Sequence, residues 1–405
     1  MTPIPTIERQ LSRVSRDTSA TRQDRSGEWL VEPGFGIYVH IPFCMHRCHY
    51  CDFNTYEGQD ALHGTYVDAL VREIEAWDGA SEVATSVFFG GGTPTLLEAS
   101  QLRRILDAIR HHFGLAADAE VTVEANPETV DEPTFESLLA AGFNRVSIGV
   151  QSLVPRVLTG LGRTHSPERA LDAIRAARRA GIEDVNADLI YGSPWERPED
   201  WHASLEGILE LEPSHVSAYA LTVEEGTPLA TLVATGRVPD VDPDIQAERH
   251  GTAEETLGAA GYARYEVSNW ARPKRASRHN VLYWSAGDYL GFGAGAHAHV
   301  HGHRWWSTRL PRDFIAAAGT GTTTAGQETL DDDTRGGEAL MLGLRLSSGI
   351  DESAFDARFG TKVLERRGRV IDSLQSSGLL ERTGGRLRLA PKATLLANDV
   401  LCRLL

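Results

Sequence analysis

Cysteine is scarce in this chain, with four in 405 residues. Three of the four lie within eight positions, which excludes the disulfide framework of a small secreted domain. The sequence also has no uninterrupted apolar run of the ~18 residues that cross a membrane. Its first residues lack the apolar centre of a signal peptide. We therefore expect a cytoplasmic protein.

An excess of positive charge is absent as well. The formal net charge is −16 at pH 7. A surface that binds nucleic acid needs clustered lysine and arginine to replace the counterions of the phosphates. We therefore expect no nucleic-acid partner.

Length and composition favour several structural units. A chain of 405 residues with 41% hydrophobic residues can bury a sizeable core and favours two to three units. Residues 1–29 interleave arginines with acidic residues and are expected to be a disordered extension. A core is expected over 30–225, a sheet extension over 226–327 and a further domain over 328–405.

Strand and helix patterns alternate through the expected core. The predicted strands cover 37–41, 86–89, 121–124, 145–150, 185–190 and 215–219, and the predicted helices cover 66–74, 101–113, 134–141, 167–180 and 200–211. Repeated strand–helix crossovers are right-handed and give parallel sheet, so this pattern predicts an incomplete barrel or an open doubly wound sheet. In both folds, reactive residues gather at the carboxyl ends of the strands.

The three clustered cysteines, Cys44, Cys48 and Cys51, follow the first predicted strand. Soft thiolates select iron–sulfur clusters, zinc or Cu(I), and a four-iron cluster with three cysteine ligands keeps one iron open for chemistry. A zinc site completed by His46 or His49 is the alternative. Structural zinc usually needs a second pair of ligands elsewhere, which this chain lacks. Cys402, in an apolar stretch, is expected to be a small buried side chain.

Other polar and glycine-rich segments also follow predicted strands. They are 90–95 (Gly-Gly-Gly-Thr-Pro-Thr), 124–127 (Glu-Ala-Asn-Pro), Gln151 and Asp188. Each alone is compatible with a turn or a helix cap. Together with the cysteine loop they place five features on one edge of the predicted sheet, which indicates a functional site.

The spacing Cys44-x3-Cys48-x2-Cys51, with His49-Tyr50 between the last two cysteines, resembles that of radical S-adenosylmethionine (SAM) proteins. The resemblance covers residues 30–405 and is to the group of oxygen-independent coproporphyrinogen III oxidases. It implies a partial (β/α)6 barrel in which a [4Fe–4S] cluster presents its open iron to SAM. The residues that it implies for SAM are Tyr38, Tyr50, Gly91, Gly92, Thr93, Glu124, Gln151, Arg163, Asp188, Ala220 and His297.

Two features separate the chain from the oxidases of this group. The oxidase pattern continues to a fourth cysteine, whereas this chain has Phe53 at that position. Residues 279–284 (His-Asn-Val-Leu-Tyr-Trp) resemble the His-Asn-x-x-Tyr-Trp signature of the haem-binding, HemW-type subgroup. The resemblance implies a haem site that contains His279, Asn280, Tyr283 and Trp284. His279 would offer an imidazole to the iron, and the two aromatic residues would offer surface to the macrocycle.

Two further patterns lie downstream. His297, His299, His301 and His303 alternate, and in a single strand they would share one face. We expect the last three to belong to an exposed polar edge strand, outside the site. In the domain 328–405, helical patterns precede a hairpin around Gly384-Gly385, which predicts a winged-helix-like α+β fold.

Three functions are compatible with these patterns. The first is a haem chaperone that binds the cluster, SAM and haem and delivers haem to acceptor haemoproteins, with a reductase or a flavodoxin- or ferredoxin-type electron donor. Peripheral membrane association is expected only through such acceptors. The second is radical decarboxylation of coproporphyrinogen III in porphyrin biosynthesis, against which Phe53 counts. The third is DNA binding by the winged-helix-like domain, but residues 328–405 carry equal numbers of basic and acidic residues, a poor composition for DNA.

Overall fold

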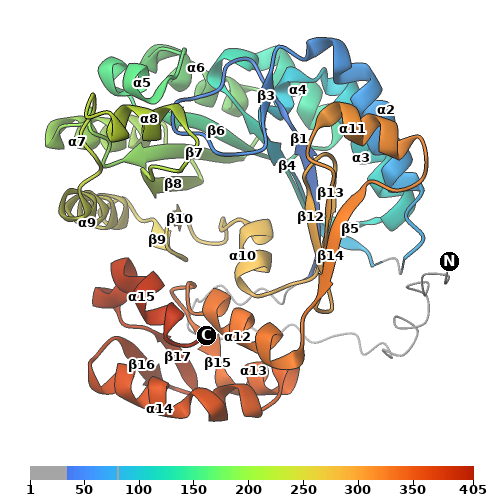
Figure 1. Ribbon diagram of the computed structural model, residues 1–405. Coiled ribbons are helices and arrows are strands. Elements are labelled where there is room, and N and C mark those ends of the chain that lie inside the picture. Colours follow the sequence, from blue (N-terminus) through green and yellow to red (C-terminus); the bar gives the residue numbers. More distant parts are fainter. Residues whose placement is uncertain (1–33, 80–81) are drawn as a thin grey trace.

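The structure is a computed structural model that describes residues 34–79 and 82–405. The extension predicted over 1–29 lies outside the described residues. Figure 1 shows a curved sheet covered by helices on its outer face, with a smaller unit below it. Within the described residues the main sheet has twelve strands in the order β14-β13-β12-β11-β1-β4-β5-β6-β7-β8-β10-β9.

All six predicted strands are present, and neighbours among them pair in parallel. They are β1 (Phe35–Ile41), β4 (Ala84–Gly91), β5 (Leu115–Ala125), β6 (Arg145–Gln151), β7 (Asp184–Tyr191) and β8 (His215–Ala220). The helices between them are α2 (His63–Glu75), α3 (Ala99–Phe113), α4 (Glu132–Ala141), α5 (Pro155–Leu161), α6 (Pro167–Arg179) and α7 (Pro198–Leu209). The predicted α/β partial barrel is therefore confirmed.

Alternating side chains give the barrel strands two different faces. In β1, Ile37 and Val39 are fully buried in the core between the sheet and the outer helices, whereas Tyr38 and His40 lie on the opposite, inner face. The same alternation continues along the other strands. The inner face carries polar and charged residues, among them Glu120, Thr122, Glu124, Ser147, Asn186, Asp188, His215 and Ser217. The barrel interior is thus built for polar chemistry.

The sheet extends beyond both ends of the barrel. On one side, β10 (Asn269–Ala271) and β9 (Ala263–Arg264) add to β8. On the other side, β11 (Tyr289–Phe292) pairs in parallel with β1, and β12 (His297–Val300), β13 (His303–Ser307) and β14 (Thr324–Thr329) follow. Helix α10 (Arg278–Trp284) carries the His-Asn-x-x-Tyr-Trp signature, and in Figure 1 it lies between the barrel and the lower unit.

The alternating histidines do not form one strand, so this expectation was wrong. His297 and His299 belong to β12, and His303 begins the returning strand β13. His301 and Gly302, with φ of 51° and 84°, form the two-residue turn between them. Two consecutive residues with positive φ are typical of a tight hairpin turn, in which alternation along a single strand is lost.

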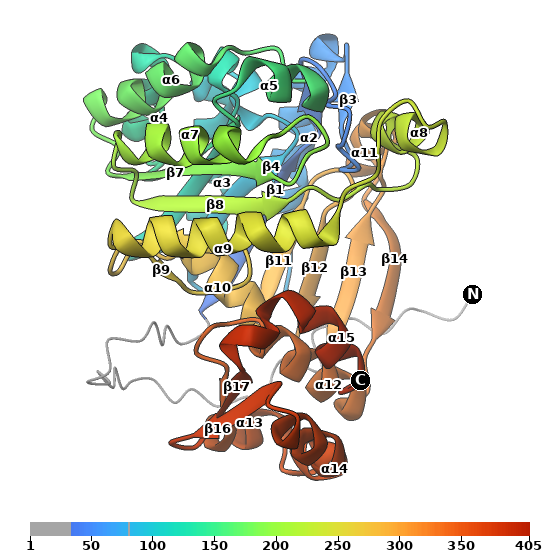
Figure 2. The ribbon, with the colours of Figure 1, turned by 90° about the vertical axis from the view of Figure 1, so that its left-hand side faces the viewer.

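The lower unit has a hydrophobic core of its own. It contains α12 (Asp332–Gly343), α13 (Glu352–Phe359), α14 (Lys362–Ser376), α15 (Ala397–Cys402) and a three-stranded sheet of β15 (Ile350–Asp351), β17 (Arg386–Leu389) and β16 (Leu380–Thr383). The hairpin predicted around Gly384-Gly385 joins β16 and β17. Figure 2 shows the unit below β11–β14. Cys402 is exposed, contrary to expectation, because it lies on the solvent side of the last helix.

The remaining elements connect these parts. They are β2 (Phe43–Cys44), β3 (Tyr56–Glu57), α8 (Pro228–Ala234), α9 (Pro243–Ala259), α11 (Pro311–Ala318) and four short 3₁₀ helices at 60–62, 94–96, 127–129 and 391–396. None of the helices in the described ranges combines the length and the apolar character that a membrane crossing requires.

Candidate functional site

The cysteine loop lies beyond the carboxyl end of β1 and is tied down by hydrogen bonds. The Cys51 amide donates to the Cys48 carbonyl at 3.2 Å. Each sulfur has a polar neighbour: Thr93 Oγ1 at 3.9 Å from Cys44, Arg163 Nη1 at 3.4 Å from Cys48 and Thr55 Oγ1 at 4.0 Å from Cys51. Hydrogen bonds to sulfur are a means by which proteins tune iron–sulfur clusters.

The three cysteines suit a cluster better than a single metal ion. In the described parts of the chain, no three His, Cys, Asp or Glu side chains converge closely enough to hold one ion. A four-iron cluster places a separate iron under each thiolate, so its ligands need not meet at one point. Burial raises the pKa of Cys44 to about 11, so ligation at neutral pH would displace a proton from this thiol.

The glycine segment after β4 packs directly on the cysteine loop. The Gly92 amide donates to the Ile41 carbonyl at 2.8 Å, and the Thr93 amide donates to the Phe43 carbonyl at 2.7 Å. A Cβ at Gly92 would lie 2.4 Å from the Phe43 carbonyl oxygen, and Gly91 has a φ of 110°. Side chains are therefore excluded at both glycines by the backbone itself.

Asn126 connects the cysteine loop to three strand ends. Arg163 Nη2 donates to Asn126 Oδ1 at 2.8 Å and to the Gly149 carbonyl at 2.9 Å. Asn126 Nδ2 donates in turn to Thr93 Oγ1 at 3.0 Å. The chain of contacts from Cys48 to Cys44 thus passes through Arg163, Asn126 and Thr93. The sequence placed Asn126 in a segment at the site edge, but only the structure shows that its amide is the bridge.

Two carboxyl groups lie on the inner face near the same edge. Burial, followed by the nearby Asp188 charge, raises the pKa of Glu124 to about 8, although the Gly91 amide donates to it at 3.0 Å. Burial also raises the pKa of Asp188, which accepts hydrogen bonds from Ser147 at 2.8 Å and Asn186 at 2.7 Å. Two buried acids at one site favour a cationic ligand.

The other residues predicted for SAM are more dispersed. Gln151 ends β6 with a φ of 65°, an uncommon conformation that is often found at functional sites. Tyr38 lies on the inner face with its hydroxyl 2.9 Å from His40 Nδ1, Tyr50 is in the cysteine loop, and Ala220 ends β8. His297 is exposed and stacks on Trp306 at 5.7 Å between ring centroids. Its ring contact with Trp306 does not involve any of the other residues predicted for SAM.

His279 is fully engaged inside the barrel. Its Nδ1 lies 2.9 Å from Ser86 Oγ and its Nε2 lies 2.9 Å from the Tyr283 hydroxyl, while its ring stacks on Phe88 at 5.3 Å. Burial lowers the pKa of His279 to about 3, so the imidazole is neutral. Ligation of haem iron by His279 would require one of these hydrogen bonds to break. In this conformation His279 instead holds Tyr283 in place.

Glu120, which the sequence did not single out, fixes the start of α10. Its carboxylate accepts hydrogen bonds from the amides of Arg278 at 2.9 Å and His279 at 3.1 Å. Carboxylates stabilise helix N-termini because the first amides of a helix lack internal partners. At the other end of α10, Trp284 lies under the Arg345 guanidinium at 5.8 Å. Trp284 therefore contacts a residue of the lower unit.

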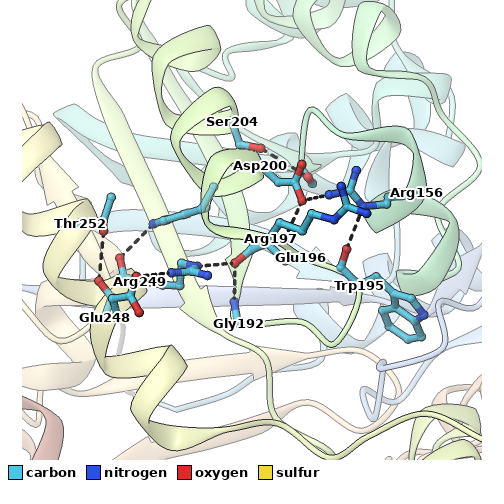
Figure 3. A network of polar contacts seen from close by, with 12 residues as sticks. Arg156, Gly192, Trp195, Glu196, Arg197, Asp200, Ser204, Glu248, Arg249 and Thr252 are labelled. Atoms are coloured by element: carbon cyan, nitrogen blue, oxygen red, sulfur yellow. Dashed lines mark hydrogen bonds and ion pairs between the residues drawn. The ribbon is translucent and has the colours of Figure 1, made fainter.

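A buried polar network holds the loop that follows β7 (Figure 3). Arg249 of α9 contacts Glu196 at 3.2 Å, and Glu196 also accepts from the Gly192 amide at 3.1 Å. The side chains of both charged residues are almost fully buried. Asp200 of α7 pairs with Arg156 and accepts from the Arg197 amide at 2.6 Å. The network thus fixes the loop next to the strand that carries Asp188.

The fold and the cysteine loop define a radical SAM protein. Residues 38–208 match the family model of the radical SAM superfamily, and residues 330–396 match that of the HemN C-terminal domain. The chain also resembles the structure of the coproporphyrinogen III oxidase HemN from Escherichia coli, with a TM-score of 0.79 and 24% identity over 92% of this chain and 90% of that one. At this identity the similarity concerns the fold alone.

Relatives that are similar in sequence identify one family within the radical SAM superfamily. The haem chaperone HemW of Mycobacterium tuberculosis is 43% identical over 378 residues, which is 92% of this chain and 95% of the relative. HemW of Bacillus subtilis is 33% identical over 90% of this chain and 97% of its own. The chain belongs to the HemW family of radical SAM proteins. This confirms the resemblance drawn from the cysteine spacing and the His-Asn-x-x-Tyr-Trp signature. Membership also implies the [4Fe–4S] cluster and SAM as cofactors.

Replacement of Arg163 should change the redox properties of the cluster. Arg163→Met removes a positive charge and an N–H donor from Cys48, which disfavours the more negative, reduced cluster. We expect the midpoint potential to fall by roughly 60 mV, the equivalent of a tenfold change for one electron. In Arg163→Lys, which keeps the positive charge, the midpoint potential should fall by less. Spectroelectrochemical titration of the reconstituted protein measures both, and equal potentials in all three proteins would contradict a role for Arg163 at the cluster.

Proposed function

We propose that this protein is a haem chaperone that binds a [4Fe–4S] cluster, SAM and haem and delivers haem to acceptor haemoproteins. The observation that carries the proposal is the match to HemW relatives along more than nine-tenths of the chain. It is supported by the His-Asn-x-x-Tyr-Trp signature, which lies on the helix α10 between the barrel and the lower unit. We expect this function in the cytoplasm, with an electron donor of the reductase, flavodoxin or ferredoxin type.

Within this proposal, Cys44, Cys48 and Cys51 hold the cluster, and its open iron is the site at which SAM binds. The backbone of Gly91, Gly92 and Thr93 forms the edge of the site next to the cysteine loop. Glu124 of β5 and Asp188 of β7 would face the cationic part of SAM, because both are buried acids on the inner face of the barrel, on strands that flank β6. Arg163 would donate a hydrogen bond to the Cys48 sulfur and would also lie close enough to pair with the carboxylate of SAM.

A decisive test compares haem binding with oxidase activity. Anaerobically reconstituted protein is titrated with haemin and, in parallel, incubated with coproporphyrinogen III, SAM and a reductant. We expect stoichiometric haem binding and no decarboxylated product. Transfer of bound haem to an apo-haemoprotein, followed by its absorption spectrum, tests delivery. Product formation at a catalytic rate would favour the decarboxylase instead, for which the fold is compatible.

The raised pKa of Glu124 predicts that SAM binding releases a proton. At pH 7 a carboxyl group with a pKa of about 8 is mostly protonated. A cationic ligand beside it lowers this pKa and displaces the proton. Calorimetric titrations with SAM in two buffers of different ionisation enthalpy should therefore show about 0.5–1 proton released near pH 7. The release should vanish in Glu124→Gln. Identical release in that variant would remove Glu124 from the SAM site.

A further inference from the structure

A series of buried hydrogen bonds leads away from Asp188 across the inside of the barrel. Asn186, two residues before Asp188 on β7, places its Nδ2 2.7 Å from Asp188 Oδ1. Its Oδ1 lies 2.7 Å from Nδ1 of His215, on the neighbouring strand β8. The other ring nitrogen of His215, Nε2, lies 2.9 Å from the hydroxyl of Tyr265, which follows β9. Asn186, His215 and Tyr265 are all buried, and we call them the inner relay.

The chemistry of the groups determines the direction of each hydrogen bond in the inner relay. An ionised Asp188 only accepts, so the Asn186 group that faces it is the NH₂ group. The Asn186 oxygen then faces His215 and only accepts, so Nδ1 of His215 carries the proton. Burial lowers the pKa of His215 well below its usual range, so the ring is neutral and Nε2 accepts from the Tyr265 hydroxyl. Every donor therefore points along the relay toward Asp188.

This direction favours the negative charge of Asp188. Hydrogen bonds that follow one another in a buried series polarise each other, and those that end on a carboxylate favour its ionised form. Burial raises the pKa of Asp188, whereas hydrogen bonds from Ser147, Ser217 and Asn186 oppose this rise. Ser147 donates to the second carboxylate oxygen of Asp188 at 2.8 Å. The relay thus acts on one oxygen and Ser147 on the other.

Other charged and titratable groups also act on Asp188. Arg145 of β6 favours its ionised form, and the carboxyl group of Glu124 of β5 disfavours it. Tyr219 of β8 is neutral, because burial raises its pKa. Burial also raises the pKa of Glu266, at the far end of the relay. The substitutions that test the relay leave these groups in place, so a difference from wild type reports on the relay itself.

The far end of the inner relay reaches α10 and the lower unit. Burial raises the pKa of Tyr265, whereas a side-chain hydrogen bond from Asn280 opposes the rise. Asn280 belongs to α10, which lies between the barrel and the lower unit (Figure 1). The main-chain carbonyl of Tyr265 accepts from the amide of Ser347, in the lower unit, at 2.9 Å. A displacement of α10 would therefore move Tyr265 and act on Asp188.

We propose that Asn186, His215 and Tyr265 are positioning residues that hold Asp188 in place for SAM and connect it with Asn280 of α10. This inference rests on the proposed function, in which Asp188 faces the cationic part of SAM, and deepens it. The asparagine of the His-Asn-x-x-Tyr-Trp signature thereby acquires a role at the end of the relay. Because coupling between two sites is reciprocal, SAM bound at Asp188 also acts on α10.

The first test is the protonation state of His215. Full-length, anaerobically reconstituted protein with ¹⁵N-labelled histidine is studied by NMR, and His215→Gln assigns the signals. Wild type should show a protonated Nδ1 and a bare Nε2 from pH 6 to pH 8, because the pKa of His215 lies well below its usual range. A proton on Nε2, or a charged ring within this pH range, would overturn the relay.

The second test is the affinity for SAM. Tyr265→Phe removes one hydroxyl group and keeps the ring. We expect SAM to bind about three- to tenfold more weakly at pH 6, the effect of one hydrogen bond, and less than about twofold more weakly at pH 8. The sign follows from the pKa of Asp188, which is higher without the relay, so that at low pH a smaller fraction of Asp188 is ionised.

Tyr262→Phe is the matched control. It removes the hydroxyl of another buried tyrosine, which donates to the Pro213 carbonyl outside the relay, and SAM affinity should be unchanged at both pH values. Equal iron and sulfide content in all proteins shows that they fold. Equal weakening by Tyr265→Phe at both pH values would mean that Tyr265 acts through packing. That result, or an unchanged affinity, would overturn the proposal.

Amide hydrogen exchange of α10, with and without SAM, tests the far end of the relay. SAM should slow this exchange in wild type but not in Tyr265→Phe, and an equal response in both proteins would overturn the link to Asn280. Wild type that binds SAM but no haem would remove the chaperone function and leave the relay in place. Wild type that binds no SAM would overturn the relay together with the SAM site of the proposed function.

Discussion

Cys48→Ser is expected to abolish the iron–sulfur cluster. In this cluster three of the four irons carry a thiolate, so loss of one cysteine leaves two of the four irons without a protein ligand. We expect iron and sulfide content after anaerobic reconstitution to fall from about four of each per chain to less than about one. The broad charge-transfer absorption should disappear with them. Cys44→Ser and Cys51→Ser should behave in the same way, because the three thiols form one set of ligands.

Cys402→Ser is the matched control for this loss. Cys402 is exposed at the end of the chain and lies in the lower unit, away from the cysteine loop. Its replacement should leave iron content and absorption unchanged. A cluster that survives Cys48→Ser, or one that is lost in Cys402→Ser, would contradict the assignment of ligands. Zinc in place of iron in the native protein would contradict it as well.

The fold was predictable because its strands and helices are marked by strong local signals. Each barrel strand combines β-branched residues with a turn, and each outer helix buries one apolar face, as in α3 and α6. The cysteine loop was equally clear, since its spacing is local in the sequence. The resemblance to the family then connected these signals with the site, and the relatives confirm it.

The partners of individual side chains were less predictable. Asn126 bridges Arg163 and Thr93 because β4, β5 and β6 end at one edge of the sheet. This arrangement depends on tertiary structure, so it cannot be predicted from any one segment of the sequence. The four alternating histidines suggested one strand, but positive φ values at His301 and Gly302 turned the chain back. His279 followed the motif, yet both of its nitrogens are used within the barrel. Local periodicity predicts elements well and long-range hydrogen bonds poorly.

Arg249→Met is expected to destabilise the loop after β7 strongly. The variant keeps most of the side-chain volume but leaves Glu196 buried without its ion-pair partner (Figure 3). Removal of one partner from a buried pair typically costs about 3–5 kcal/mol. At pH 8 we therefore expect native-state hydrogen exchange at the amides of β7 and α7 to accelerate at least about a hundredfold. Glu248→Gln alters only the exposed partner of Arg249 and should change the exchange rate of these amides by less than about fivefold.

The pH dependence of this effect separates loss of the ion pair from loss of packing. Burial already raises the pKa of Glu196 to about 7, and the Gly192 amide and Arg249 oppose this rise. Without Arg249 the pKa rises further, so below pH 7 the carboxyl group is protonated and its burial costs less. The destabilisation by Arg249→Met should therefore shrink between pH 8 and pH 6, and Arg249→Met combined with Glu196→Gln should recover part of the loss at pH 8. A destabilisation that is the same at both pH values and in the double variant would mean that Arg249 acts through its packing alone.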